Sequence, residues 1–409
     1  MKDVNILILS KYPPIEGGVS SRVYWLAKAL GERGHNVHIV TNALEVEPEY
    51  REVLDLNDHN YNPKNVQVHS TDPSPTIEAN PSQIPFSKKY CEKLASLAIE
   101  VIEEHKIDLI DSRYLIPYAV SGYLAKSITG IPQIISHAGS DLQRLYPSKY
   151  LNRLLENILK SADGIITSEA QIGFFHNLGV PNTKIFSTPD LSVDTKVFNP
   201  DVSPFDLKPY VSDQRFFSGI PIIAYVGKIT YNFESKGLPE LLKACSLIKE
   251  DFLLLFVSNG KKIEQLKELV DKAKLTQKTV FIPFFPPWKM PSILKACTCL
   301  IALENGTSPT LNYHVPTTPA EAIAIGSCVL MSREIHEKAV YNKLKNGKEV
   351  LVVNNANVNE LKTSLEKIIK NPEIANKIGL AGHNALLQKK DLNEYPERIL
   401  EIYKSVLSQ

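Results

Sequence analysis

Residues 5–41 read NILILSKYPPIEGGVSSRVYWLAKALGERGHNVHIVT and join two apolar segments through a segment of helical length. The apolar segments, 5–10 and 36–41, do not alternate apolar with polar residues, which is typical of strands covered by helices on both faces. Residues 19–33 between them have the pattern of an amphipathic helix. This strand–helix–strand unit predicts a parallel sheet of the α/β class.

The same order of segments recurs in the rest of the first half. Further strands are expected at 107–112, 132–137 and 163–168, and helices at 87–105, 116–128, 148–161 and 169–178. The stretch 42–86 interrupts this order with acids, asparagines and prolines. We expect a long loop beside the ligand site there, not a core element.

A segment rich in Pro, Asp and Ser, residues 189–220, is the expected linker to a second α/β half. Strands are then expected at 221–227, 252–258, 279–284, 298–303, 327–332 and 349–353, with helices between them and three more in 357–409. We predict two doubly wound Rossmann-like domains, 1–200 and 201–385, and a final helix, 386–409, that packs back on the first. Ligands of such sheets bind at the carboxyl ends of the strands, so we expect a deep cleft between two facing halves.

The charge and composition of the chain exclude several classes of function. The 409 residues carry 46 basic and 45 acidic side chains, whereas nucleic-acid binding would need clustered basic charge. Five scattered cysteines predict reduced thiols rather than disulfides or a metal site. No apolar stretch approaches the ~18 residues of a membrane span, and the N-terminus lacks signal-peptide features. We expect a cytoplasmic protein without a transmembrane segment, which leaves peripheral membrane contact open.

Gly17 and Gly18 lie between the first expected strand and the first expected helix. Glycine lets a ligand approach the backbone closely, and the free N–H groups of a helix start bind anions. The alternative is a tight turn in which Ser20 or Ser21 satisfies the helix-start donors. The pattern is not G-x-G-x-x-G, so the dinucleotide fingerprint is absent.

Two lysines follow the first strand of the second half. Lys228 comes after the strand-end Gly227, and Lys236 precedes Gly237 at the start of the next expected helix. Two cations beside a helix start suit a diphosphate, whose negative charge grows as its bond to a sugar breaks. The alternative is a pair of solvated surface lysines.

Residues 318–321, TPAE, have the pattern of a capping box with proline at the first helical position. In this account, Thr318 and Glu321 only stabilise the helix start. In the alternative account, the helix start binds phosphate and Glu321 hydrogen-bonds ribose hydroxyls. His137, at the end of an expected strand, is either a hydrogen-bonded structural residue or a partner of a sugar hydroxyl.

Five motifs, in order along nearly the whole chain, resemble the retaining GT-B-fold glycosyltransferases of the group 1 family (glycosyltransferase family 4-like). PPIEGGVSSRVYWLAKALGERGHNVHIVT looks like that family's Gly-Gly loop and first helix, and SHAGSDL is similar to its strand-end His segment. SVDTKVFNP resembles its domain-linking G-V-D-x-x-x-F-x-P signature, with Ser192 in place of Gly. YVGK…SKGLPELLKA and PAEAIAIGSCVLMS resemble its GR…KG…L and LEAMA-x-G-x-PV motifs.

The resemblance implies a role for each residue that matches a motif. It implies that Gly17–Gly18 line the donor phosphate and that His137 contacts the transferred sugar. It also implies that Lys236 neutralises the diphosphate, with Lys228 beside it. Glu321 would hold the ribose.

Two departures from the family pattern concern the second half. Lys228 stands where the family has Arg, which keeps the charge but loses the bidentate fork. The family's E-x7-E pair lacks its first member, because Tyr313 stands eight residues before Glu321. Pro316, Thr318 and Glu321 fit the P-x-K-x-x-E spacing of one branch, with Thr for Lys. Sugar recognition in this loop is then expected from Tyr313, His314, Thr317 and Thr318.

The resemblance implies sugar transfer from a UDP-, GDP- or ADP-sugar to an acceptor hydroxyl, with retention of configuration. The expected acceptor is a carbohydrate, a lipid-linked molecule or a small molecule, which supplies the attacking hydroxyl. It attacks from the face that the diphosphate leaves, without a protein nucleophile. No D-x-D or G-x-S-x-G motif is present, and we expect no obligatory metal or other cofactor. The alternatives are a non-catalytic partner or binding subunit, a sugar-nucleotide epimerase and a phosphorylase of the same fold.

Overall fold

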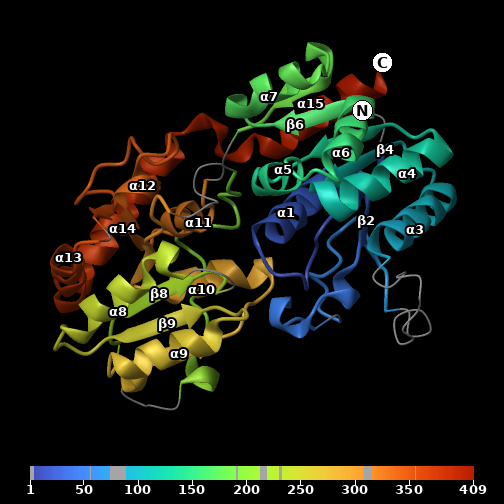
Figure 1. Ribbon diagram of the computed structural model, residues 1–409. Coiled ribbons are helices and arrows are strands. Elements are labelled where there is room, and N and C mark those ends of the chain that lie inside the picture. Colours follow the sequence, from blue (N-terminus) through green and yellow to red (C-terminus); the bar gives the residue numbers. More distant parts are fainter. Residues whose placement is uncertain are drawn as a thin grey trace. The chain divides into compact units, whose positions relative to one another are not determined.

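The computed structural model describes residues 4–55, 57–73, 89–189, 192–211, 219–229, 233–307, 315–354 and 356–409. The chain forms two compact units, each with its own parallel sheet (Figure 1). The first unit consists of Met1–Pro189 and Glu394–Gln409, and the second of Asp190–Asn393.

The first unit is built on a seven-stranded parallel sheet with the strand order β3-β2-β1-β4-β5-β6-β7. Its strands are β1 (Asn5–Leu9), β2 (Asn36–Thr41), β3 (Val66–Ser70), β4 (Leu109–Arg113), β5 (Gln133–Ser136), β6 (Gly164–Thr167) and β7 (Ile185–Ser187). Its helices are α1 (Gly18–Glu32), α3 (Tyr90–His105), α4 (Val120–Thr129), α5 (Ser140–Leu145), α6 (Asn152–Ser161), α7 (Ile172–Leu178) and α15 (Tyr395–Leu407). This is the doubly wound arrangement predicted for the first half.

One face of this sheet packs against α3. Leu7 and Leu9 of β1 are buried in a cluster with Ala98 and Val101 of α3. The buried α3 positions in the cluster are 94, 98, 101 and 102, which is the spacing of one helix face. Burying each large apolar side chain stabilises the fold by ~1.5–3 kcal/mol relative to leaving it exposed.

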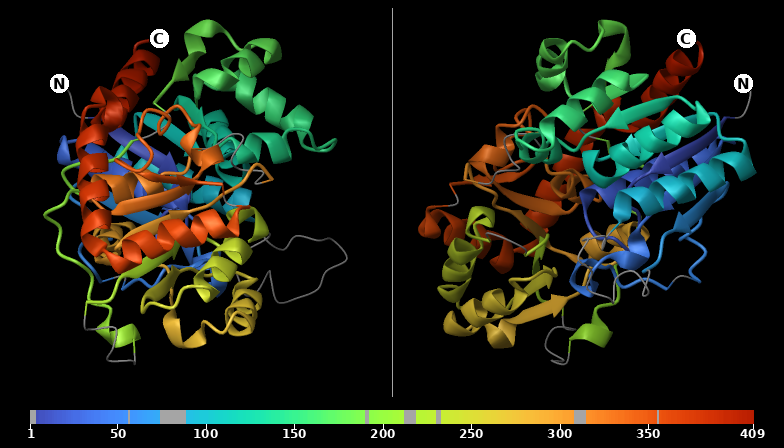
Figure 2. Two further views of the ribbon diagram at one scale, coloured as in Figure 1. Left: turned by 90° about the vertical axis from the view of Figure 1, so that its left-hand side faces the viewer. Right: turned by 45° about the vertical axis from the view of Figure 1, so that its right-hand side comes forward.

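The chain returns to the first unit through α15, which is drawn in red in Figure 2. On β4, the Asp111 carboxylate accepts hydrogen bonds from Arg113 Nη2, at 2.7 Å, and from the Tyr403 hydroxyl of α15. Arg113 Nη1 also donates to the Tyr395 hydroxyl, at 2.7 Å. All four side chains are buried, so this network, together with apolar packing, fastens α15 to β4.

The expectation of a loop without core structure at 42–86 is wrong for part of that stretch. Val66–Ser70 forms β3, which pairs with β2 at the edge of the sheet, with Val66 opposite Val37. Only Val66 of this strand is buried, because an edge strand exposes much of its surface. Its sequence, VQVHS, therefore lacks the apolar run of the inner strands. Residues 56 and 74–86 lie outside the described residues.

The second unit is built on a six-stranded parallel sheet with the strand order β10-β9-β8-β11-β12-β13. Its strands are β8 (Ile222–Val226), β9 (Leu253–Val257), β10 (Thr279–Ile282), β11 (Cys299–Ala302), β12 (Cys328–Ser332) and β13 (Leu351–Val353). Its helices are α8 (Leu238–Ser246), α9 (Ile263–Lys272), α10 (Met290–Ala296), α11 (Thr318–Ala324), α12 (Arg333–His336), α13 (Val358–Lys370) and α14 (Pro372–Leu387). Leu254 of β9, Leu241 of α8 and Leu365 of α13 are fully buried in one core cluster.

The structure divides the chain after Pro189 and after Asn393, which differs from the expected boundaries at 200/201 and 385/386. The physical reason is a set of hydrogen bonds near the two ends of the second unit. The Val193 N–H donates to the Leu392 carbonyl at 3.1 Å, and Asn393 Nδ2 donates to the Thr195 hydroxyl at 2.9 Å. These bonds hold the residues after 191 in the second unit.

Two further expectations concern thiols and membranes. All five cysteines are free, and the four other than Cys91 are buried. Among the described parts of the chain, none of the helices combines the length and apolar character that crossing a membrane requires.

Candidate active site

The predicted glycine pair forms the turn between β1 and α1. Gly17 has φ 119° and ψ 170°, which residues with a side chain rarely adopt, and it directly precedes α1. A Cβ added to Gly18 would meet no atom within 4 Å. The space beside this helix start can therefore hold a ligand, whose negative charge the first N–H groups would stabilise.

The alternative account of this turn, capping by a serine, finds no support at Ser20. The cap residue is Gly17, which has no side chain, and no side-chain cap bond is present at the start of α1 within the described part of the chain. The Ser20 hydroxyl is buried and has no hydrogen-bond partner among the residues that the structure describes. Ser20 therefore contributes no capping bond to this helix start.

The glycine turn is braced by residues that follow β2. The Glu16 N–H donates to the Tyr50 carbonyl at 2.9 Å, and the Glu52 N–H donates to the Pro14 carbonyl at 2.8 Å. The Glu16 and Glu52 side chains are only 1% and 8% exposed. Sequence reasoning missed both glutamates. Glu16 could have been identified from the sequence, because it directly precedes the glycine pair.

His137 lies directly after β5, and both of its ring nitrogens have partners in the first unit. Its Nδ1 accepts the Gly139 N–H at 3.0 Å, which places the ring proton on Nε2, 2.8 Å from the Thr167 hydroxyl. Burial lowers the pKa of His137, against the opposing effect of the Asp141 carboxylate, so the ring is neutral. A contact with the transferred sugar would require the Nε2–H to change partner, and that contact stays a prediction.

Asp141, which sequence reasoning missed, fixes the loop that carries His137. Its carboxylate is fully buried and accepts backbone N–H groups of Leu115, Ala138 and Leu142, each at 2.8 Å. Backbone donors to a carboxylate are strong, charge-assisted hydrogen bonds. They join the chain after β4 to the chain after β5 at one edge of the sheet.

In the second unit, Lys228 follows β8 in a backbone segment that is fixed on both sides. The Ser258 hydroxyl donates to the Gly227 carbonyl at 2.6 Å, and the Ile229 N–H donates to the Asn259 carbonyl at 2.9 Å. These bonds join the chain after β8 to the chain after β9. Lys228 is half-buried at this edge of the sheet.

Lys236 ends a short 3-10 helix, Glu234–Lys236, directly before α8. A Cβ on Gly237, which has φ 66°, would come within 2.7 Å of Leu303 Cβ and 2.8 Å of the Leu303 carbonyl oxygen. Glycine therefore allows this turn to approach the end of β11. There the Lys236 ammonium forms an ion pair with the Glu304 carboxylate, and the two side chains are 24% and 19% exposed. Lys236 is thus not the solvated surface lysine of the alternative account.

Glu304 is a residue that sequence reasoning missed. The Ser332 hydroxyl, at the end of β12, donates to the Glu304 carbonyl, and this bond fixes the backbone from which Glu304 reaches Lys236. The available signal was its position after the apolar run 298–303, the same strand-end position that identified Lys228. Its pairing with Lys236 has no signal in the sequence.

The predicted capping box at the start of α11 is wrong. The cap residue is Thr317, not Thr318, and its side chain makes no cap hydrogen bond within the residues that the structure describes. Pro319 is the second helical residue, and the Glu321 N–H donates to the Thr317 carbonyl at 3.0 Å. Thr317 and Thr318 are half-buried at this helix start. Tyr313 and His314 lie outside the described residues.

The start of α11 is held by Tyr341. The Tyr341 hydroxyl donates to the Pro316 carbonyl. The pKa of Tyr341 is raised, mainly by burial and further by the negative charge of Glu321. The Glu321 carboxylate is therefore near this phenol, on the first turn of a helix that is fixed in place.

Each unit carries its candidate residues at the carboxyl edge of its own sheet. In the first unit, Gly17 follows β1 and His137 follows β5, with β4 between these two strands. In the second unit, β8 and β11 are neighbouring strands. Lys236 and Glu304 form their ion pair beyond the carboxyl ends of these two strands. The start of α11 follows β11 at the same edge.

Two family models match the chain. The model for Glycosyltransferase Family 4 matches residues 16–189, and the model for Glycosyl transferases group 1 matches residues 211–385. The two matches together cover most of both units.

Known proteins and structures are similar over long stretches. N-acetyl-alpha-D-glucosaminyl L-malate synthase of Bacillus anthracis is 24% identical over 282 residues, which is 66% of this chain and 66% of that protein. Sucrose-phosphate synthase from Thermosynechococcus elongatus superposes with a TM-score of 0.66 at 18% identity and covers 99% of both chains. HepE of Anabaena, solved with UDP and glucose, superposes with a TM-score of 0.68 at 16% identity over 98% of this chain and 100% of its own.

The two sheets, the family matches and these structural likenesses define an enzyme class, the glycosyltransferases of the GT-B fold. Within that class, the chain belongs to the group 1 glycosyltransferases.

Proposed function

We propose that this glycosyltransferase moves a sugar from a nucleoside-diphosphate sugar to an acceptor hydroxyl, with retention of configuration and without an obligatory metal. The ion pair of Lys236 with Glu304, at the carboxyl edge of the second sheet, is the observation that carries the proposal. Parallel α/β sheets bind ligands at that edge.

Electrostatic stabilisation of the leaving group is the role that suits Lys236. The diphosphate gains negative charge as its bond to the sugar breaks, and a cation already in position stabilises that charge without reorganising. Glu304 holds the Lys236 ammonium in a half-buried place, and Gly237 fixes the backbone that carries it. A lysine in this position supplies positive charge that a divalent ion supplies in metal-dependent enzymes.

In the proposed reaction, the acceptor oxygen bonds to the anomeric carbon on the face from which the diphosphate leaves. The bond between that carbon and the diphosphate oxygen breaks, and the acceptor proton passes to the leaving diphosphate. The products are a glycoside and a nucleoside diphosphate. The protein positions the two substrates, and it forms no covalent bond to the sugar.

The relatives suggest which substrates to test first. HepE is solved with UDP and with UDP-glucose, so UDP-sugars head the donor panel, followed by GDP- and ADP-sugars. The Bacillus anthracis relative is named for a glucosaminyl malate product. L-malate should therefore be tested as an acceptor together with sugars and lipid-linked molecules.

A thermal-shift panel of UDP, GDP, ADP and their sugars tests the proposal. A ligand at 100 times its Kd adds about 2.7 kcal/mol to the free energy of unfolding. The donor that stabilises the chain then enters a turnover assay, in which we expect release of nucleoside diphosphate and an unchanged anomeric configuration by NMR. Release of sugar phosphate on adding inorganic phosphate would instead identify a phosphorylase. Loss of turnover with EDTA, restored by manganese, would refute metal independence.

A further inference from the structure

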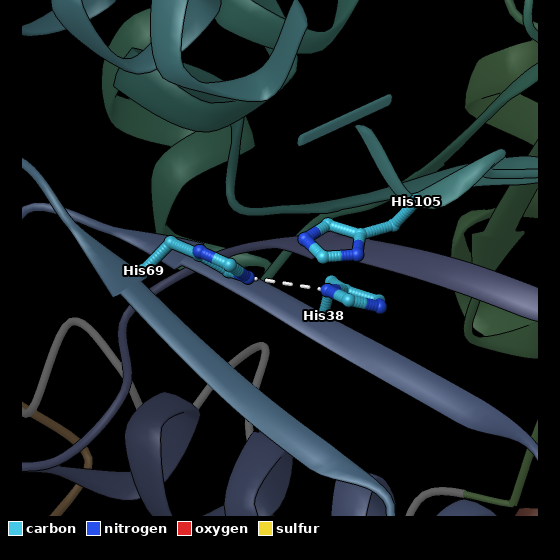
Figure 3. A group of neighbouring side chains, drawn as sticks. All are labelled: His38, His69 and His105. Carbon is cyan, nitrogen blue, oxygen red and sulfur yellow. Dashed lines mark hydrogen bonds between the residues drawn. The ribbon is translucent and has the colours of Figure 1, made fainter. Parts of the chain in front are cut away.

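Three histidines from separate elements of the first unit gather in one place (Figure 3). His38 lies on β2, His69 lies on β3, and His105 is the last residue of α3. One ring nitrogen of each lies within 4.8 Å of the corresponding nitrogens of the other two. His38 Nδ1 and His69 Nε2 are 3.1 Å apart.

The register of the sheet explains why these side chains meet. His38 is opposite Gln67, and Val40 is opposite His69. Residues two apart in a strand share a face, so His38, Val40 and His69 all lie on one face. Val40 belongs to the buried cluster formed with α3, which identifies this as the face that α3 covers. His105 comes onto the same face because it ends that helix.

Each of the three rings offers one ligand nitrogen to the same small space. Burial lowers the pKa of His38 to about 4 and lowers the pKa of His69 as well, and the neighbouring histidines add to both shifts. Neutral imidazole is the form that binds metal ions, because its unprotonated nitrogen carries the lone pair. The convergence of three such nitrogens is a requirement of a metal site that this cluster meets.

We propose that His38, His69 and His105 bind a divalent transition-metal ion of the zinc class. Nitrogen ligands of tetrahedral zinc, at about 2.0–2.1 Å from the ion, lie roughly 3.3 Å from each other. The His38 and His69 nitrogens are close to that separation, at 3.1 Å. Imidazole ligands favour zinc, nickel and copper over magnesium, calcium and manganese, which prefer oxygen.

Metal binding requires only a shift of one proton within the cluster. The bond between His38 and His69 uses one N–H and one lone pair. On metal binding, the proton of the donor ring moves to the other nitrogen of that ring. Both rings then direct a lone pair at the metal ion, and each ring stays uncharged. The His105 ring, which stacks on His38 with centroids 4.2 Å apart, turns to supply the third nitrogen, and water completes the coordination.

The helix end that carries His105 lies at the edge of the sheet opposite the candidate active-site residues of the first unit. The Asn5 side chain, at the start of β1, donates to the His105 and Lys106 carbonyls at 3.3 and 3.1 Å. The end of α3 is therefore at the amino edge of the sheet, whereas Gly17 and His137 follow carboxyl ends. The Glu104 carboxylate, 3.7 Å from His105 Nε2, adds negative charge that favours a cation. A metal here fastens α3 to the edge strand β3 and takes no part in sugar transfer.

Zinc titration of the full chain, stripped of metal by a chelator, tests the site by calorimetry without any nucleotide. We expect one zinc ion per chain and a higher melting temperature with zinc. His69→Gln should weaken zinc binding at least about tenfold. Removing a residue that only hydrogen-bonds a metal ligand already costs about that much, and His69 is proposed to bind the metal directly. His59→Gln is the matched control, because that side chain is 92% exposed and outside the cluster.

His105→Gln provides a second test if His69→Gln fails to fold, because the His105 side chain is 31% exposed at a helix end. Cobalt provides a spectroscopic check. We expect the bands of tetrahedral cobalt without a thiolate charge-transfer band, and no change with Cys91→Ser. Zinc binding that is equally tight in the wild type and both cluster variants, or that is lost with Cys91→Ser, would overturn the proposal.

Discussion

Lys236 is the residue on which the proposed chemistry depends most. Replacing it by alanine removes one preorganised positive charge, which should lower kcat by at least ~100-fold at saturating donor. Steady-state kinetics with the donor from the ligand panel measure this effect. Lys243→Ala, on the exposed side of α8, is the control and should leave kcat unchanged. A near-wild-type kcat for Lys236→Ala would reject the role of this lysine.

Glu321 can be assigned to ribose binding or to stability by one variant. Because the cap residue of α11 is Thr317, Glu321 is not the partner of the cap in a capping box. Glu321→Ala should therefore not cause the loss of about 0.5–2 kcal/mol that removal of a helix cap causes. We expect the donor KM to rise while the melting temperature changes little. Glu337→Ala, an exposed glutamate, is the control. A fall in melting temperature with an unchanged KM would assign Glu321 to stability alone.

The substitutions Gly17→Ala and Gly18→Ala form a matched pair that tests the turn before α1. Gly17→Ala forces a side chain into a backbone conformation that costs about 1–3 kcal/mol, so it should lower the free energy of unfolding in urea. Gly18→Ala meets no atom within 4 Å and should keep the stability of the wild type. If a ligand approaches this turn, Gly18→Ala should still raise a substrate KM. Unchanged kinetics in Gly18→Ala would remove the turn from the site.

At the scale of the element, the inner strands could be predicted because they are continuous apolar runs, such as 252–258 and 327–332. Two edge strands, β3 and β7, could not. Their residues are mostly half-buried or exposed, so VQVHS and IFS carry no strong pattern. The capping box failed for a related reason. The pattern at 318–321 matches the motif, but the helix begins at Thr318, one residue earlier than the motif requires, so its cap residue is Thr317.

The attachment of α15 depends on one buried hydrogen-bond network. Tyr403→Phe removes a donor to the buried Asp111 carboxylate, and hydrogen bonds to charged groups contribute about 1.5–3 kcal/mol. We expect the free energy of unfolding to fall by that amount. Tyr150→Phe, at a tyrosine that is 86% exposed, should have no measurable effect. Equal stability of the two variants in urea would show that the network does not hold α15.

At the scale of the whole molecule, the sequence places His137 and Lys228 correctly after the ends of β5 and β8, because the order of strands and helices determines which loops meet at the carboxyl edge. Contacts between segments that are distant in the sequence could not be predicted. Lys236 and Glu304 pair across 68 positions, and the three histidines come together from β2, β3 and α3. Neither grouping follows from spacing along the chain, because both depend on register and on the approach of separate elements.

The most direct test of the central claim is amide hydrogen exchange of the full chain with and without the nucleoside diphosphate that binds best. With the nucleoside diphosphate bound, we expect slower exchange at 227–229, 233–238, 303–305 and 317–321, the segments that carry Lys228, Lys236, Glu304 and Glu321. Slowed exchange confined to other parts of the second unit, with these four segments unchanged, would contradict a diphosphate site at the carboxyl edge of its sheet.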